Sequence, residues 1–219
     1  MIKLYSYFRS SASFRVRIAL NLKAVDFKTM PVHLTRGGGE QFSAEFKGLN
    51  PAALLPVLED GEGAERRLLT QSMAIVEYLE ETHPLPPLLP SNAADRARVR
   101  AIALSIACDI HPLNNLRVLG YLKKNLGLSD EVKEGWYRHW IDVGLAALET
   151  QLAGDSRTGT FCHGESAGLA DIFLVPQIFN AQRFNCDLSG RPTIMRIFDS
   201  CITLPAFAAA APAQQPDAE

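Results

Sequence analysis

The sequence changes character at a proline-rich stretch that lies before the middle of the chain. Residues 83–90 read His-Pro-Leu-Pro-Pro-Leu-Leu-Pro, and four prolines in eight residues form a stiff, extended connector. Before this stretch, short apolar runs alternate with helical patterns, and after it every pattern is helical. We therefore expect an α/β domain over residues 1–84, a linker over residues 85–92 and an all-helical domain over residues 93–219.

The expected elements of the first domain alternate between strand and helix. Strands are predicted at residues 2–7, 27–32, 54–59 and 66–70, and helices at residues 12–22, at 40–46 and from 72 onward. Ser72 is expected to be the N-cap of the last of these helices, because serine side chains accept hydrogen bonds from the first turn.

The second domain is predicted to hold one long helix and several shorter ones. The long helix spans residues 93–125, and Pro112 should kink it because proline removes a backbone donor and clashes with the preceding turn. Further helices are expected at residues 131–152, 169–184, 193–201 and 205–211. The segment 212–219 has little to bury and is expected to be frayed.

The first strand runs into a serine-rich turn, Arg9-Ser10-Ser11-Ala12-Ser13, and then into a helix. The first turn of a helix presents unpaired N–H groups and partial positive charge, so this arrangement can bind an anion. The same pattern also fits an ordinary capped helix after a strand, and the stretch alone does not separate these two readings.

Pro56 stands inside the predicted third strand, although proline cannot donate to a sheet ladder. A cis Leu55–Pro56 bond would leave the backbone N–H and C=O of Leu55 free to pair with a peptide-like ligand. A trans proline on an edge strand is the alternative, and spacing alone favours it.

Charge and cysteine content exclude several classes of function. The formal net charge of −2 and the pI of about 6.2 provide no field for nucleic acid or membranes, and no apolar run reaches the roughly 20 residues needed to span a bilayer. The four cysteines form no C-x-x-C pair, so we expect neither a disulfide framework, a metal site nor a dithiol redox centre. No signal pattern is visible at the first residues, and a cytoplasmic protein is expected.

The combination of these features resembles the cytosolic glutathione transferases. Residues 9–20, Arg-Ser-Ser-Ala-Ser-Phe-Arg-Val-Arg-Ile-Ala-Leu, are similar to the signature S-S-C-S-W-R-V-R-I-A-L of the zeta class, which includes maleylacetoacetate isomerase and maleylpyruvate isomerase. The resemblance continues through residues 49–51, 71–72, 77–81, 109–115 and 174–177 and ends at residues 215–217. It implies a thioredoxin-like N-terminal domain followed by a C-terminal helical bundle.

The resemblance implies a glutathione-dependent cis–trans isomerase that converts maleylacetoacetate to fumarylacetoacetate in aromatic amino acid catabolism. In this reaction a thiolate adds reversibly to the double bond of a dicarboxylate substrate, so glutathione acts as a coenzyme. Ser10 and Ser11 would stabilise the thiolate and Arg9 would assist them. Arg9, Arg117 and Arg183 would bind the substrate's carboxylates, although a surface ion pair is the ordinary reading of a single arginine.

The remaining contacts to glutathione are also implied by the resemblance. The Leu55 backbone would pair with the cysteinyl residue, Gln71 and Ser72 would hold the γ-glutamyl carboxylate, and Gln41 is the candidate for the glycine end. A polar arc beside Pro112 would approach glutathione as well, with the alternative that it is a satisfied polar patch at the kink. The arc consists of His111, Asn114 and Asn115.

Two departures from the family pattern affect the expected site. Ala12 replaces the signature cysteine and Phe14 its tryptophan, and Gly168 stands where the family usually has Ser or Thr before Asp171, which is expected to be structural. Maleylpyruvate isomerase, a broader zeta-type transferase and a non-catalytic ligand-binding protein of this fold are the alternative functions. A glutaredoxin-like role is disfavoured because no cysteine starts the first helix, and the resemblance implies a homodimer.

Overall fold

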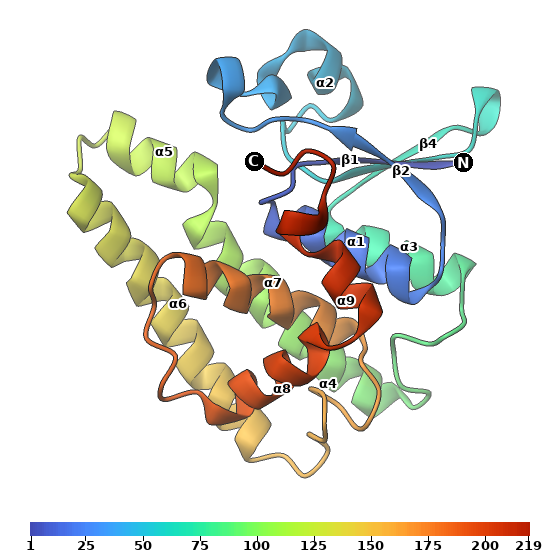
Figure 1. Cartoon of the computed structure of the whole chain (residues 1–219), viewed down its shortest axis with the longest axis vertical. Helices are drawn as coiled ribbons and strands as arrows, with labels where there is room; N and C mark the ends of the chain where they lie inside the picture. Colours follow the sequence, from blue (N-terminus) through green and yellow to red (C-terminus); the bar gives the residue numbers. More distant parts are fainter. The chain divides into compact units, whose positions relative to one another are not determined.

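The computed structural model describes all 219 residues and divides them into two compact units. The N-terminal unit contains residues 1–87 and 203–219, and the helical unit contains residues 88–202. The sequence had placed residues 203–219 with the helical half. They group with the first unit because α9 (Pro205–Ala210) packs along α1 (Ser11–Leu22) and buries Phe207 (Figure 1).

The N-terminal unit is built on a four-stranded mixed sheet in the order β2-β1-β3-β4. β1 (Ile2–Ser6) runs parallel to β2 (Phe27–Pro31), whereas β3 (Val57–Asp60) is antiparallel to both β1 and β4 (Arg67–Thr70). This is the thioredoxin-like arrangement, and it confirms the fold class expected for this half.

The strand directions bring four connections to one end of the sheet. Ser6 at the end of β1 lies beside Pro31 at the end of β2, and Tyr5 pairs with Val57 at the start of β3. Val57 in turn pairs with Thr70 at the end of β4. The segments that follow β1, β2 and β4 and the segment that precedes β3 therefore meet at this end.

Helices cover both faces of the sheet (Figure 1). On one face α1 packs against α3 (Ser72–Thr82), and on the other lies the short helix α2 (Ala44–Leu49). Phe46 of α2 forms a buried cluster with Val32 and Val57. Short 3-10 turns complete the unit: η1 (Arg36–Gly38), η2 (Glu40–Phe42), η3 (Gly63–Glu65) and η6 (Pro212–Gln214).

The helical unit surrounds a central helix, α7 (Leu169–Arg183), most of whose residues are buried. It packs against α4 (Ala93–Leu104) and α8 (Pro192–Ile202), and α6 (Asp130–Ala153) packs against α8. Asp171 is structural, as expected, because its carboxylate accepts hydrogen bonds from the N–H groups of Gly168 and Cys162 at 2.9 and 2.8 Å. None of the helices is both long and apolar enough to cross a membrane.

The single long helix predicted over residues 93–125 is wrong. α4 gives way to a π-helical turn, η4 (Ser105–Ile110), then to a 3-10 turn, η5 (His111–Asn114), and α5 (Leu116–Lys124) begins afresh. Pro112 in the first turn of η5 cannot continue the α-helical ladder. Asn115 adopts an extended conformation and its side chain caps α5, accepting a hydrogen bond from the N–H of Arg117 at 3.0 Å.

The expectation of a frayed tail is also wrong. Pro212 and Gln215 are buried, and the Gln215 amide donates to the carbonyl oxygens of Ala209 and Ala211, both at 3.0 Å. The carboxylate of Asp217 accepts a hydrogen bond from the N–H of Phe8 at 3.0 Å. The tail is held by polar contacts, which its apolar content alone could not predict.

Candidate functional site

The turn between β1 and α1 presents the start of a helix at the end of the sheet where the connections meet. Ser10 is the N-cap of α1, and its Oγ accepts a hydrogen bond from the N–H of Ser13 at 3.2 Å. Ser11 is the first residue of the helix and is buried, while Ala12 in the next position is only half-buried. The first turn of α1 contains no acidic residue of its own, so no side chain of the helix offsets the positive end of its dipole.

Arg9 precedes this helix and is exposed. Its guanidinium lies over the ring of Phe8, with 4.7 Å between the guanidinium carbon and the ring centroid. It forms no ion pair with a carboxylate. The surface ion pair considered for a lone arginine is therefore absent, and a full positive charge remains beside the N-terminus of α1.

The start of α3 lies at the same end of the sheet, but Ser72 is not its N-cap. Gln71 occupies that position with φ +68° and ψ 115°, and Ser72 is the first helical residue. The buried hydroxyl of Ser72 accepts a hydrogen bond from Arg15 Nη1 at 3.2 Å, so the α1 and α3 starts are tied together. A positive φ at a residue other than glycine costs of order 1–3 kcal/mol, and such conformations cluster at functional sites.

The segment before β3 contains a cis Leu55–Pro56 peptide bond, which resolves the two readings of Pro56. Leu55 packs against the cluster of Val32, Phe46 and Val57 through its side chain. Its backbone N–H and C=O make no hydrogen bond within the protein, since the ladder between β1 and β3 begins at Val57. These two groups remain available for an extended ligand backbone.

Gln41 lies in η2, in the connection that follows β2. Its amide nitrogen donates to the carbonyl oxygen of Leu34 at 3.3 Å, and its buried Oε1 has no hydrogen-bond partner. Tyr7 and His33 connect this region to the end of β1, with ring centroids 4.9 Å apart. All the glutathione-contact candidates of the N-terminal unit therefore belong to connections at one end of the sheet.

The polar arc of the helical unit is organised around the π-helical and 3-10 turns. Asn114 Nδ2 donates to the carbonyl oxygen of Tyr137 at 3.3 Å, and its buried Oδ1 has no partner. His111 begins η5 and is half-buried. Asn115 uses its side-chain oxygen to cap α5.

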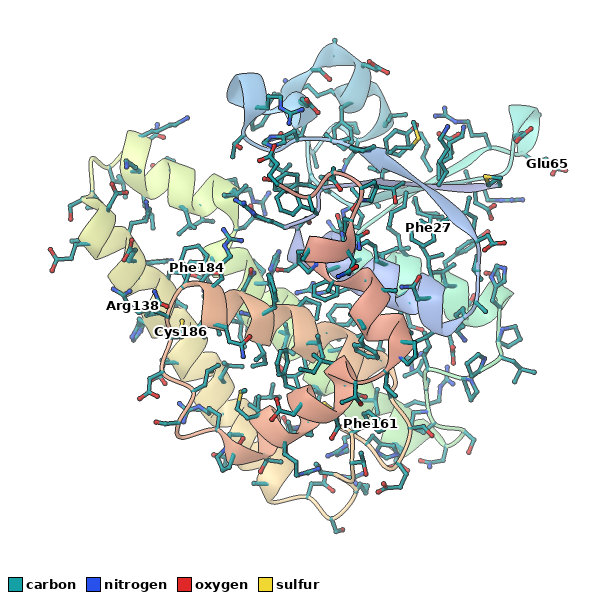
Figure 2. The ribbon with its side chains drawn as sticks, viewed as in Figure 1. Phe27, Glu65, Arg138, Phe161, Phe184 and Cys186 are labelled. Carbon is teal, nitrogen blue, oxygen red and sulfur yellow. The ribbon has the colours of Figure 1, made fainter.

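Arg117 and Arg183 are both exposed and form no ion pair. The guanidinium carbon of Arg183 is 4.9 Å from the ring centroid of Phe184, and that ring stacks on Tyr137 at 3.8 Å. Figure 2 labels Phe184 at the end of α7 and Arg138 on α6. Burial raises the pKa of Tyr137, and the charge of Arg183 partly opposes this effect. Arg183 and Asn114 thus lie around the same tyrosine.

Sequence reasoning missed two buried arginines of α1. Arg15 is 2 % exposed and holds the start of α3 through Ser72. Arg17 is 0 % exposed and donates hydrogen bonds to the β1–α1 turn and to α9. Both stand among apolar residues in the run Phe-Arg-Val-Arg-Ile, and a charge in a buried helical face requires buried acceptors. That requirement was the signal available in the sequence.

Comparison with known proteins supports this description. The family of glutathione S-transferase N-terminal domains matches residues 1–81. A Vibrio cholerae protein named probable maleylacetoacetate isomerase is 54% identical over 215 residues, which cover 98% of this chain and 97% of that protein. A maleylpyruvate isomerase from a Ralstonia species is 46% identical over 216 residues, covering 99% of each chain.

A solved structure is similar to this protein over the same length of chain. The crystal structure of maleylacetoacetate isomerase from Methylobacterium extorquens AM1, with bound malonate and glutathione, superposes with a TM-score of 0.94. The two chains are 40% identical, and the match covers 99% of each. Similarity in sequence and in fold therefore extends through both units.

Proposed function

The chain belongs to the zeta-class glutathione transferase family, and from this premise we propose that it is a glutathione-dependent cis–trans isomerase acting on maleylacetoacetate. One observation carries the proposal. The start of α1, the unpaired backbone of Leu55 and Gln71 at positive φ all belong to connections at one end of the sheet.

The residues at this end fit glutathione, an anionic tripeptide with a thiol. The N–H and C=O of Leu55 lack partners within the protein and match the backbone of the cysteinyl residue. Gln71 and Ser72 at the N-terminus of α3 suit the γ-glutamyl carboxylate. The buried, unpaired Oε1 of Gln41 requires a donor, which supports its assignment to the glycine end.

When bound, glutathione supplies the sulfur nucleophile that adds to the substrate double bond and later leaves it. Ser10 and Ser11 stand where a thiolate is stabilised by hydroxyl donors and by the dipole of α1, which lowers a thiol pKa. Phe8, Ser10 and the backbone of the turn are fixed before any ligand arrives, so little reorganisation accompanies binding.

Three arginines are proposed to bind the carboxylates of the substrate. Arg9, Arg117 and Arg183 form no ion pairs, and their planar guanidinium groups suit bidentate contacts with carboxylates. We propose that the polar arc of the helical unit also contacts glutathione through His111, Asn114 and Asn115. The unpaired Oδ1 of Asn114 supports its role, whereas the side-chain oxygen of Asn115 is already engaged in the cap of α5.

Maleylpyruvate is the alternative substrate, and it is favoured by the 46% identity with a maleylpyruvate isomerase over nearly the full length. The higher identity of 54% with a protein named for maleylacetoacetate leads us to prefer that substrate. Cytoplasmic location and a homodimer are further parts of the proposal. They rest on family membership.

An absorbance assay with both substrates tests the proposal directly. Purified protein is mixed with maleylacetoacetate or maleylpyruvate, with glutathione present or omitted, and loss of the cis isomer is followed. We expect glutathione-dependent turnover, with a higher kcat/KM for maleylacetoacetate. A lack of glutathione-dependent turnover of either substrate would refute the isomerase assignment, and preference for maleylpyruvate would select the alternative.

A further inference from the structure

Arg17 is a buried cation in the middle of α1, and it faces the turn that precedes the helix. Its Nε donates to the carbonyl oxygen of Ala210 in α9 at 3.0 Å. Nη1 donates to Ser6 Oγ at 3.0 Å and to the Tyr7 carbonyl oxygen at 3.5 Å. Nη2 donates to the carbonyl oxygen of Phe8 at 3.0 Å. A single side chain thus joins the end of β1 to α9.

Asp217 of the C-terminal tail binds the same turn through the N–H of Phe8. Its Oδ2 accepts the hydrogen bond from the N–H of Phe8 at 3.0 Å, while Oδ1 is buried without a hydrogen-bond partner. The tail is held in place by the Gln215 amide, which donates to two carbonyl oxygens of the α9 region. Both backbone groups of Phe8 are therefore fixed by side chains, the carbonyl by Arg17 of α1 and the N–H by Asp217 of the tail.

The residues held in this way lead directly to the proposed thiolate site. The carbonyl oxygen of Tyr7 accepts a hydrogen bond from the N–H of Ser10 at 2.9 Å as well as the contact from Arg17. Ser10 in turn caps α1. A displacement of Phe8 would consequently move Arg9 and Ser10 relative to the first turn of the helix.

The positive charge of Arg17 and the negative charge of Asp217 also offset each other. Burial lowers the pKa of Arg17 to about 10, and the Asp217 carboxylate opposes this shift, so the guanidinium stays protonated at neutral pH. An uncompensated carboxylate near the start of α1 would disfavour a thiolate there. The buried guanidinium offsets that field, so Asp217 can hold Phe8 by its acceptor oxygen.

We propose that Asp217 and Arg17 are positioning residues, which together hold the Tyr7–Ser10 turn in the geometry that the thiolate site requires. This inference rests on the proposed function of that site. It assigns a role in the reaction to the C-terminal tail, a segment to which the proposed function gives no part. The alternative is a purely structural role, in which loss of Asp217 lowers stability and leaves the site unchanged.

The test compares Asp217→Ala, which removes the acceptor, with Asp217→Asn, which keeps an acceptor and removes the charge. Gln214→Ala is the matched tail control, because that side chain is exposed and makes no hydrogen bond. Three quantities are measured: amide hydrogen exchange of residues 7–14 without ligand, the pKa of the bound glutathione thiol from its ultraviolet absorbance, and kcat/KM.

For Asp217→Ala we expect the Phe8 amide to exchange about tenfold faster in the folded protein and the bound thiol pKa to rise. We also expect kcat/KM to fall by roughly 10- to 100-fold, as displacement of a positioned group does. The kcat/KM of Asp217→Asn is expected to stay within about threefold of the wild-type value. Gln214→Ala should match the wild type in all three measurements.

Two results would overturn the proposal. Either Asp217→Ala retains the wild-type thiol pKa and kcat/KM, or Asp217→Asn is impaired as strongly as Asp217→Ala, which would show that charge rather than the hydrogen bond acts. Failure of the proposed function looks different, since the wild type would then neither bind nor use glutathione. The exchange of the Phe8 amide is measured without ligand and still decides whether Asp217 holds the turn.

Discussion

Gly144 in the middle of α6 permits the close approach of the π-helical turn that precedes the polar arc. A Cβ atom at this position would lie 2.3 Å from Cγ1 and 2.4 Å from Cδ1 of Ile110, far inside van der Waals contact. Ile110 is 2 % exposed and packed within the helical unit, so it has little room to move. Gly144→Ala should therefore destabilise the protein, although alanine is the better helix former.

The size of the effect follows from two opposing terms. Overpacking a buried position costs typically about 1–3 kcal/mol, and overlap with two atoms of a buried side chain places Gly144→Ala near the upper limit. Replacing glycine by alanine inside a helix returns about 1 kcal/mol. The net loss is therefore about 2 kcal/mol, which corresponds to a fall in Tm of about 4–8 °C for a chain of this size.

Gly135 offers a matched control in the same helix. It is exposed, and a Cβ atom there would have no neighbour within 4 Å. Gly135→Ala should show the helix-propensity term alone and raise stability by up to about 1 kcal/mol, or about 2–4 °C in Tm. Urea and thermal unfolding of Gly144→Ala and Gly135→Ala measure whether their changes in stability have opposite signs.

The variant Ile110→Ala tests whether overlap with the Ile110 side chain causes the expected loss of stability. In an Ile110→Ala background the two Cβ atoms would be 3.6 Å apart, which is ordinary contact, and the added methyl group would fill part of the cavity. Gly144→Ala should then be neutral or stabilising, giving a coupling energy of about 2 kcal/mol in the double-mutant cycle. Stabilisation by Gly144→Ala in the wild-type background, or additivity in the cycle, would refute the reasoning.

Three further predictions concern the site and the sheet. Ser10→Ala should lower kcat more than Ser11→Ala, and loss of the helix cap should also cost about 1 kcal/mol of stability. Steady-state kinetics and urea unfolding of both variants measure these effects. A loss of kcat in Ser11→Ala that equals or exceeds the loss in Ser10→Ala would contradict the assignment of Ser10. Arg183→Ala should raise the substrate KM about tenfold with little change in kcat, as loss of a charged hydrogen bond does, and an unchanged KM would remove it from the site. Hydrogen bonds from Arg66 and Lys3 lower the pKa of Glu59 from 4.5 to about 2, so the free energy of unfolding of the wild type should decline as pH falls through this range. Glu59→Gln should make this decline smaller in urea unfolding. An unchanged pH dependence would contradict the role given to Glu59.

The regular elements of both units could be predicted from the sequence because each buries a periodic apolar face. β1, α1 and α7 lie within one or two residues of their predicted limits. The long helix over residues 93–125 failed for a local reason, since a proline and a capping asparagine end one helix and start another without interrupting the apolar period. Hydrophobic periodicity predicts which side chains are buried, and the π-helical turn keeps Ile106 and Ile110 of the apolar pattern buried without continuing the α-helix.

The tail and the start of α3 were beyond such reasoning. Residues 212–219 carry no apolar pattern, and their position depends on the N–H of Phe8 in a distant turn and on a carbonyl oxygen of α9. Gln71 adopts a positive φ that nothing in the local sequence demands, and Ser72 is engaged by Arg15 rather than by the first turn of its own helix. Both features depend on polar partners far apart in sequence, whereas hydrophobic periodicity is a local property.

The two buried arginines of α1 explain why stability and chemistry depend on the same contacts. Arg15 ties α1 to the start of α3 at Ser72, and Arg17 ties it to the Phe8 turn and α9. A buried guanidinium deprived of an acceptor is costly, so each arginine imposes the position of the backbone it contacts. The N-termini of α1 and α3 are thereby fixed relative to each other by polar contacts within the N-terminal unit, and a substitution in the tail can alter the candidate glutathione site without touching the ligand.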